Sequence, residues 1–246
     1  MGRRVLVIGA TSKIAEAAAR LWAIDGHDFL LVGRTLEKLE AMAPDLMARG
    51  ASSVSCRSLD FTDLPSHSAF VADLVASFGK IDIALLCHGL LGEQREGELD
   101  FGKAHEVFQV NFLSFVSLLT PLASHMELNR AGSLVVVSSV AGDRGRQSNY
   151  IYGSAKGAIS LFAQGLRNRL TPANVDVITV KPGFVDTPMT AHVEKNKLFA
   201  TPEVIGQGIV NAVEKRRNVV YLPVIWWGIM TVIKLIPEFI FKKLKL

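Results

Sequence analysis

Several features that mark other classes of protein are scarce or absent in this sequence of 246 residues. It has only two cysteines, Cys56 and Cys87, and they form no Cys-x-x-Cys pair. Because no cluster of histidines and cysteines has metal-ligand spacing either, we expect reduced core thiols, without a disulfide or a metal site. The apolar start at residues 5–8 is too short for a signal peptide, so we expect a cytoplasmic protein.

The pattern of a nucleic-acid-binding protein is also missing. The net charge is +4, but the basic residues are dispersed apart from residues 215–217 and the lysines near the C-terminus. We therefore expect no nucleic-acid partner. Internal repeats, low-complexity segments and linkers are absent as well. With 49% hydrophobic and 20% charged residues, the composition is that of a folded globule.

What the chain does contain is an alternation of strand and helix patterns. Apolar runs predict strands at 5–8, 28–32, 53–58, 81–86, 133–137, 175–180 and 219–222, with helical patterns between them, among others at 36–49 and 66–78. We predict one doubly wound α/β domain of the Rossmann type, with a mainly seven-stranded parallel sheet and helices on both faces. This domain spans residues 1–222, and an apolar C-terminal helical tail spans residues 223–246.

The stretch after the fifth predicted strand holds residues suited to acid–base chemistry. Tyr152 and Lys156 stand four residues apart at the start of a predicted helix, so both side chains project from one face. A phenol has a pKa of about 10, and a neighbouring ammonium lowers it toward neutral pH. Ser139, just past the strand end, can hydrogen-bond the oxygen that exchanges the proton. The set indicates carbonyl–alcohol chemistry, although a Tyr-x-x-x-Lys spacing alone often arises by chance.

The first predicted strand leads into a turn that suits a phosphate group. Gly9 follows the strand, and a helical pattern then continues to Trp22. Such a turn presents backbone N–H groups and a helix N-terminus to a pyrophosphate, and glycine permits its close approach. The residues that we assign to this contact are Gly9, Thr11, Ser12, Lys13 and Ile14.

Together with Pro182-Gly183 after a later strand, these features resemble the short-chain dehydrogenase/reductase superfamily of the ordinary short type, over residues 3–222. The resemblance implies a nicotinamide cofactor that gives or takes a hydride beside Ser139, Tyr152 and Lys156. It also implies that Asn111 lies in a distorted helix and relays protons through a water, and that the protein forms a homo-oligomer. Further positions that it places near the cofactor are Asp60, Phe61, His88, Gly89, Pro182, Gly183, Val185 and Thr187, with residues 190–200 as a mobile lid.

The sequence departs from the family pattern at two turns. The first turn usually reads Gly-x-x-x-Gly-x-Gly, and here Lys13 and Ala15 replace the second and third glycines. The turn after the fourth strand usually reads Asn-Asn-Ala-Gly or close to it, and here it contains Cys87-His88. This second change puts side-chain contacts to the cofactor in doubt, and we interpret His88 as a turn residue beside the cofactor.

The choice between the two nicotinamide cofactors depends on Arg34. An acidic residue after the second strand would accept the ribose 2′-hydroxyl of NAD, whereas a guanidinium suits a 2′-phosphate. We therefore predict NADP(H); the alternative is an arginine that only flanks a helix. Lys13 could neutralise the same phosphate or be a solvated lysine.

Two further roles stay open at this stage. Asn111 could be a packing residue without a relay function. Arg144 and Arg146 lie in a polar connector, residues 143–149, that we expect to form part of the substrate wall. They could pair locally or bind an anionic group of the substrate.

The predicted function is NADPH-dependent reduction of a ketone. Tyr152 would protonate the carbonyl oxygen, and Lys156 would tune Tyr152 and order the cofactor ribose. The connector and the apolar tail look similar to bacterial family members that reduce a keto-sugar on a polyprenyl phosphate, so our first substrate guess is a lipid-linked or lipid-like ketone. The alternatives are a soluble NAD(P)-dependent alcohol dehydrogenase or ketoacyl reductase, and a non-catalytic cofactor-binding scaffold.

The tail is apolar but too interrupted to cross a membrane, because Lys234 and Pro237-Glu238 break it before the ~20 apolar residues that a crossing helix needs. Plotted at about 100° per residue, its polar residues fall on one stripe, which predicts a helix lying in a membrane interface and kinked at Pro237. The alternative is packing on its own domain or on a second subunit. The stripe consists of Thr231, Lys234, Glu238, Lys242 and Lys245.

Overall fold

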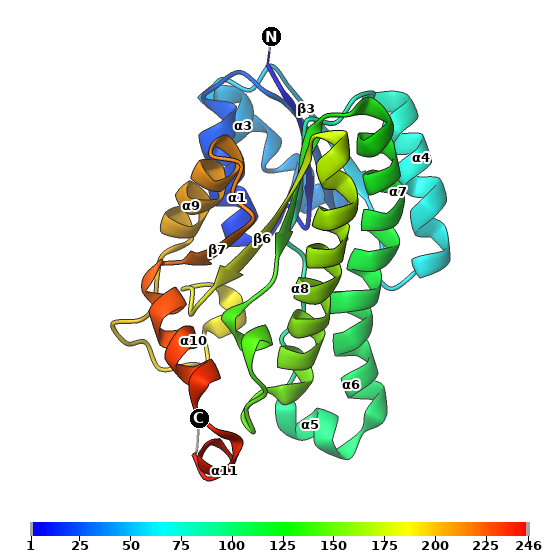
Figure 1. Ribbon diagram of the computed structural model, residues 1–246. Helices are drawn as coiled ribbons and strands as arrows, with labels where there is room; N and C mark the ends of the chain where they lie inside the picture. The colour runs from blue at the N-terminus through cyan, green and yellow to red at the C-terminus, as the bar shows by residue number, and fades with distance from the viewer. Residues whose placement is uncertain (1, 245–246) are drawn as a thin grey trace.

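In a computed structural model that describes residues 2–244, seven strands form one parallel sheet (Figure 1). The strands are β1 (Arg4–Ile8), β2 (Asp28–Gly33), β3 (Ser53–Ser58), β4 (Ile83–Leu86), β5 (Gly132–Val137), β6 (Val175–Pro182) and β7 (Val219–Leu222). Their order is β3-β2-β1-β4-β5-β6-β7, so the topology switches direction between β1 and β4. This order confirms the predicted doubly wound fold, in which ligands bind at the carboxyl ends of the strands.

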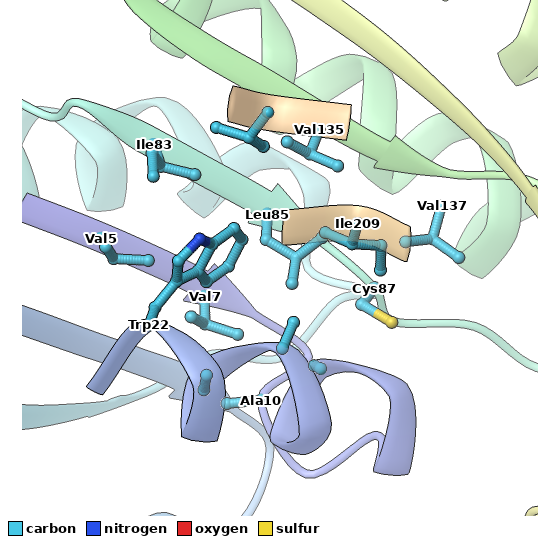
Figure 2. Close-up of a cluster of buried hydrophobic side chains, with 14 of the residues drawn as sticks. Val5, Val7, Ala10, Trp22, Ile83, Leu85, Cys87, Val135, Val137 and Ile209 are labelled. Atoms are coloured by element: carbon cyan, nitrogen blue, oxygen red, sulfur yellow. The ribbon is translucent and has the colours of Figure 1, made fainter. Parts of the chain in front are cut away.

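One face of the sheet is covered by α1 (Lys13–Ala23), α2 (Leu36–Glu40), α3 (Ala43–Arg49) and α9 (Pro202–Glu214). Alternate strand residues point to this face because side chains alternate along a strand. Figure 2 shows Val7, Leu85 and Val135 of three neighbouring strands gathered near Trp22 of α1. The Trp22 side chain is fully buried, so this cluster holds α1, and with it the turn that precedes α1, firmly on the sheet.

The other face is covered by α4 (His67–Phe78), α7 (Ser114–Asn129) and α8 (Tyr150–Leu170), which stand side by side in Figure 1. α7 continues α6 (Phe101–Phe108) through a π-helical segment, η2 (Gln109–Leu113). This continuous helix is long and apolar enough to cross a membrane. Its buried residues, which include Leu118 and Leu122, pack in the core with Ile159 of α8, as expected for the core helix of a globular domain.

Several predicted elements differ in the structure, including β4, which begins at Ile83 and not at residue 81. Residues 36–49 form two helices, α2 and α3, so the prediction of one helix was wrong. Pro44 lies in the first turn of α3, where a missing N–H is tolerated, but it would disrupt a helix that continued from α2. β6 extends two residues beyond the predicted strand and includes Pro182.

Short elements gather around the carboxyl edge of the sheet or connect the larger ones. They are η1 (Leu64–Ser66), α5 (Gln94–Leu99), η3 (Val140–Asp143), η4 (Thr171–Ala173) and η5 (Pro188–Thr190). The tail forms α10 (Ile225–Leu235) and α11 (Glu238–Phe241), separated at Pro237 as predicted. Lys245 of the predicted polar stripe lies outside the described residues.

The inner face of the tail packs on its own domain. Trp226 and Met230 of α10 are 4% and 1% exposed and form a cluster with Val140 of η3. A side chain at Gly183 would overlap the indole ring of Trp226. The predicted boundary after Leu222 therefore marks only a change in the sequence pattern, because the tail packs continuously with the domain.

Candidate active site

Three of the predicted catalytic residues meet where β5 ends and α8 begins. Ser139 is the second residue after β5, and its side-chain oxygen accepts a hydrogen bond of 3.1 Å from the Ala141 N–H. The Ser139 hydroxyl lies close enough to Tyr152 to lower the pKa of its phenol. Lys156 Nζ lies 5.8 Å from the centroid of the Tyr152 ring and donates to the carbonyl oxygen of Val137 at 3.1 Å.

The protonation of this group differs from the sequence prediction. Burial raises the pKa of Tyr152 to about 12, against a smaller lowering by the hydrogen bond from Ser139. Burial also lowers the pKa of Lys156 to about 8. The expected lowering of the Tyr152 pKa by Lys156 was wrong for this structure, because the loss of water around both buried groups outweighs their attraction. Tyr152 is therefore a protonated phenol at neutral pH, which is the form that donates a proton to a carbonyl oxygen.

Asn111, the fourth predicted residue, lies in the π-helical segment η2 and is fully buried. Its Nδ2 donates to the carbonyl oxygens of Leu90 at 2.6 Å and Val107 at 2.8 Å, and its Oδ1 accepts from the Leu90 N–H at 3.1 Å. A Cβ added at Gly89 would lie 3.0 Å from Asn111 Oδ1 and 3.7 Å from Lys156 Nζ. The helix distortion that the resemblance implied is thus present next to Lys156, whereas the relay itself stays a prediction.

The first turn has the shape that a pyrophosphate needs. Gly9 has φ = 79°, and a side chain there would overlap the backbone of His88, so only glycine fits. Ser12 begins α1 without capping it by a side-chain hydrogen bond, which leaves the helix N-terminus suited to an anion. The Ser12 hydroxyl instead accepts from Cys87 Sγ at 3.3 Å. Thr11 and Ile14 flank this turn at the surface.

A cleft of about 410 Å³ lies between this turn and the loop after β6. Its lining includes Lys13 on one side and Thr187 and Pro188 on the other. Lys13 Nζ bonds the carboxylate of Glu16 at 2.7 Å, and the Lys13 side chain is 52% exposed. Lys13 is therefore engaged within its own helix, and this favours the solvated-lysine alternative.

The polar groups after β2 and β3 remain at the surface. Arg34 is exposed at the end of β2. The carboxylate of Asp60 accepts hydrogen bonds from the Thr62 N–H at 2.8 Å and the Thr62 hydroxyl at 2.7 Å. These bonds, and to a lesser degree the nearby Arg34, hold the pKa of Asp60 below its usual value.

The side chains of Phe61 and His88 are core residues. The His88 ring stacks between the rings of Phe61 and Phe115, with centroid distances of 4.3 Å and 4.0 Å. Its Nε2 donates to Ser114 Oγ at 2.7 Å, since that hydroxyl itself donates to the Val110 carbonyl. Burial lowers the pKa of His88 well below its usual value, so the ring is neutral. His88 therefore lies in the turn after β4 with its backbone and Cβ against Gly9 and its ring in the core, and its place beside the cofactor stays a prediction.

The loop after β6 is held by its own hydrogen bonds. The Val185 carbonyl accepts from Thr190 Oγ1 at 2.5 Å, and the Thr187 N–H donates to the same hydroxyl at 3.3 Å. The predicted lid returns at Ala200, which accepts from the Asp186 N–H and donates to the Phe184 carbonyl, both at 2.9 Å. The structure thus places Pro182 at the end of β6 and Gly183, Val185 and Thr187 on the loop that follows, where Thr187 lines the cleft.

Sequence reasoning missed a buried polar network on the substrate side. The carboxylate of Asp143 in η3 is 3% exposed and forms an ion pair with Lys181 at the end of β6. It also accepts a hydrogen bond of 2.6 Å from the Tyr221 hydroxyl of β7. All three residues follow or end neighbouring strands at one edge, and this shared position is the signal that could have revealed them.

Arg144 fastens the tail to the connector. Its Nη1 donates to three carbonyl oxygens at the end of α10, those of Ile233, Lys234 and Ile236, at 2.8, 3.1 and 2.6 Å. Its Nη2 donates to Glu238 at 2.9 Å, and its guanidinium lies 3.8 Å from the centroid of the Phe241 ring. Local pairing and binding of an anionic substrate group were both left open for Arg144, and the structure shows local pairing.

Comparisons with known proteins agree with the fold. The short chain dehydrogenase family matches residues 3–198. An uncharacterized oxidoreductase of Mycobacterium tuberculosis is 37% identical over 240 residues, which cover 98% of this chain and 96% of that protein. An NADP-dependent 3-hydroxy acid dehydrogenase of Schizosaccharomyces pombe is 26% identical, over 89% of this chain and 90% of that protein.

Among solved structures, an alcohol dehydrogenase of Thermococcus sibiricus complexed with 5-hydroxy-NADP superimposes with a TM-score of 0.81. The match covers 92% of this chain and 98% of that one at 24% sequence identity. At this identity the likeness supports the fold alone.

Proposed function

The chain belongs to the short-chain dehydrogenase/reductase family of oxidoreductases, and we propose that it reduces a ketone to a secondary alcohol with NADPH. The observation that carries this proposal is the group of Ser139, Tyr152 and Lys156 at the end of β5, with a protonated phenol beside the serine. A non-catalytic scaffold would have no need to bury a tyrosine and a lysine side by side at this edge.

In the proposed reaction, NADPH when bound supplies a hydride to the carbonyl carbon. Tyr152 donates its proton to the carbonyl oxygen, and Ser139 hydrogen-bonds the same oxygen as negative charge develops on it. The ammonium of Lys156 stabilises the phenolate that remains on Tyr152. Asn111 and Lys156 both lie beside Gly89, and a water held at Asn111 would return a proton to Tyr152 by way of Lys156.

The residues of the first turn fit a dinucleotide. Gly9 leaves room for a close approach, and the uncapped N-terminus of α1 would hold the pyrophosphate. Arg34 supports NADPH over NADH, because it is exposed and its guanidinium suits a 2′-phosphate. The NADP dependence in the name of the Schizosaccharomyces pombe relative points the same way.

We also propose that the substrate is lipid-like, with a keto-sugar on a polyprenyl phosphate as the first guess, and that the tail touches the cytoplasmic membrane surface. Lys234, Lys242 and Lys243 accompany the apolar side chains of the tail and suit anionic headgroups. The outer face of the tail carries exposed apolar residues: Val224, Ile225, Trp227, Val232, Leu235, Phe239, Ile240 and Leu244. A homo-oligomer that covers this face is the competing arrangement.

The reaction is tested with NADPH deuterated at C4 and a panel of aliphatic ketones. We expect one deuterium at the carbinol carbon of the product, and a preference for NADPH over NADH that Arg34→Leu reduces by about 10- to 100-fold. Tight NADH binding with negligible NADPH binding would contradict the role of Arg34. Absence of transfer to every ketone would favour the scaffold.

The membrane contact is tested by flotation with vesicles that contain phosphatidylglycerol. We expect the full chain to float at low salt and the double variant Trp227→Ser, Leu235→Ser to stay in solution. Leu128→Ser is the matched control, since Leu128 is 86% exposed on α7, away from the tail. If the wild-type protein does not float but runs as an oligomer that the double variant breaks, a second subunit covers the tail.

A further inference from the structure

Arg146 is a guanidinium without a partner in the described part of the chain. It lies in the connector between η3 and α8 and is partly buried. Its Nε is inaccessible to solvent and makes no hydrogen bond, and no carboxylate within residues 2–244 pairs with it. Burial lowers the pKa of Arg146, with no acidic neighbour to raise it.

Arg167 is the internal comparison. Burial lowers the pKa of Arg167 too. Its guanidinium, however, donates to the Val177 carbonyl at 2.6 Å and to Thr179 Oγ1 and the Asn218 carbonyl, both at 2.8 Å. The partly buried guanidinium of Arg167 thus has hydrogen-bond acceptors, as expected from the cost of an unpaired buried charge. Arg146 lacks them.

The neighbouring charged groups of the connector are already engaged. Asp143 accepts from Lys181 and Tyr221, and Arg144 is bound to the end of α10. Neither residue is free to rearrange toward Arg146 without breaking a buried ion pair or the attachment of the tail. Asn149 Oδ1 is also buried without a hydrogen-bond partner, so the connector as folded gives Arg146 Nε no acceptor.

The position of Arg146 points to the substrate as the source of that acceptor. Arg146 precedes Tyr152 by six residues on the chain that leads from Ser139 into α8. The cofactor phosphates are expected at Gly9 and Arg34, after β1 and β2, and β4 separates β1 from β5. With strands about 4.8 Å apart, those phosphates lie roughly 10 Å or more across the sheet from the end of β5.

We infer that Arg146 binds an oxyanion carried by the ketone substrate, so that the enzyme prefers anionic ketones over neutral ones. This inference rests on the reductase activity proposed above. The planar guanidinium binds a carboxylate and a phosphate ester in the same forked manner. The proposed ligand of Arg146 is therefore an anionic group on the ketone, and the test includes both a carboxylate and a phosphate ester.

The experiment compares three ketones of one chain length: 3-oxooctanoate, its neutral ethyl ester and 2-oxooctyl phosphate. For Arg146→Gln we expect the KM of the preferred anion to rise about 10- to 100-fold with little change in kcat, and the KM of the ethyl ester to stay within about threefold. Arg146→Lys should recover part of the loss. Arg57→Gln is the control, because it removes one exposed positive charge from the distant edge strand β3.

A binding measurement separates this inference from the proposed reaction. Octanoate and octyl phosphate are titrated calorimetrically into the protein with NADP⁺, with and without Arg146→Gln. The wild type could reduce no ketone and still bind an anion, with Arg146→Gln weakening that binding at least tenfold. This result would contradict the proposed reaction and support the anion site. If Arg146→Gln leaves both anion binding and the KM of the anionic ketones unchanged, or affects the ethyl ester equally, the inference is wrong.

Discussion

The carboxyl edge of the sheet has two sides that are built differently. On the cofactor side, after β1, β2 and β4, positions are set by backbone approach and apolar stacking: Gly9 lies against the backbone of His88, whose ring is held between Phe61 and Phe115. The charged side chains there, Lys13, Arg34 and Asp60, stay at the surface. On the substrate side, after β5, β6 and β7, buried and half-buried titratable groups define the site, among them Lys156, Tyr152 and the Asp143–Lys181 pair.

This difference predicts where single polar side chains matter. Charges and hydrogen bonds interact more strongly when water is excluded, and an unpaired buried group is costly. Replacing one buried polar group on the substrate side should therefore have a large effect. Replacing an exposed polar side chain on the cofactor side should have a small effect, since the backbone still forms the phosphate-binding turn.

The largest effect is expected for Tyr152→Phe. It removes the proton donor and leaves the ring, so kcat for ketone reduction should fall about 1,000-fold while the Kd of NADPH stays within about twofold. Steady-state kinetics and fluorescence titration with NADPH measure the two quantities. Tyr150→Phe is the matched control, because Tyr150 lies in the same helical turn but is 43% exposed. Full reductase activity of Tyr152→Phe would rule out the assigned acid–base role.

The second-largest effect is expected in the dependence of kcat on pH. Because burial lowers the pKa of Lys156 to about 8, its side chain is charged below that pH and neutral above it. A neutral amine no longer stabilises the Tyr152 phenolate, so kcat for reduction should fall about tenfold per pH unit above pH 8. In Lys156→Arg this alkaline limb should disappear, although kcat itself drops. A wild-type limb that begins only near the ordinary lysine pKa would show that Lys156 is not desolvated in the working enzyme.

The two sides also differ in how far the sequence predicts them. The alternation of strands and helices predicts the sheet, and a strand end followed by a helix start brings Ser139, Tyr152 and Lys156 together. The attachment of Arg144 to α10 joins residues 89 to 94 positions apart, and no local pattern encodes such a contact. The direction of the Tyr152 pKa shift was unpredictable for a related reason, since desolvation depends on packing from the whole fold.

A third prediction tests the attachment of the tail. Arg144→Gln removes hydrogen bonds to the end of α10 and the ion pair with Glu238, so we expect the free energy of unfolding to fall by about 2 kcal/mol. Amide exchange in α10 should accelerate. Arg95→Gln, which breaks the exposed pair with Glu98, should leave the free energy of unfolding nearly unchanged. Equal losses in the two variants would mean that the Arg144 network is no stronger than a surface pair.

The smallest effect is expected for Lys13→Ala on the cofactor side. Lys13 replaces a family glycine in the phosphate turn, but its ammonium is bound to Glu16 and its side chain is half-exposed. The Kd of NADPH should therefore change less than about threefold, because backbone N–H groups at the start of α1 supply the anion site. Glu16→Ala frees Lys13 and should, if anything, tighten NADPH binding. A loss of tenfold or more in Lys13→Ala would show that a polar side chain also controls this side, and the contrast between the two sides would no longer hold.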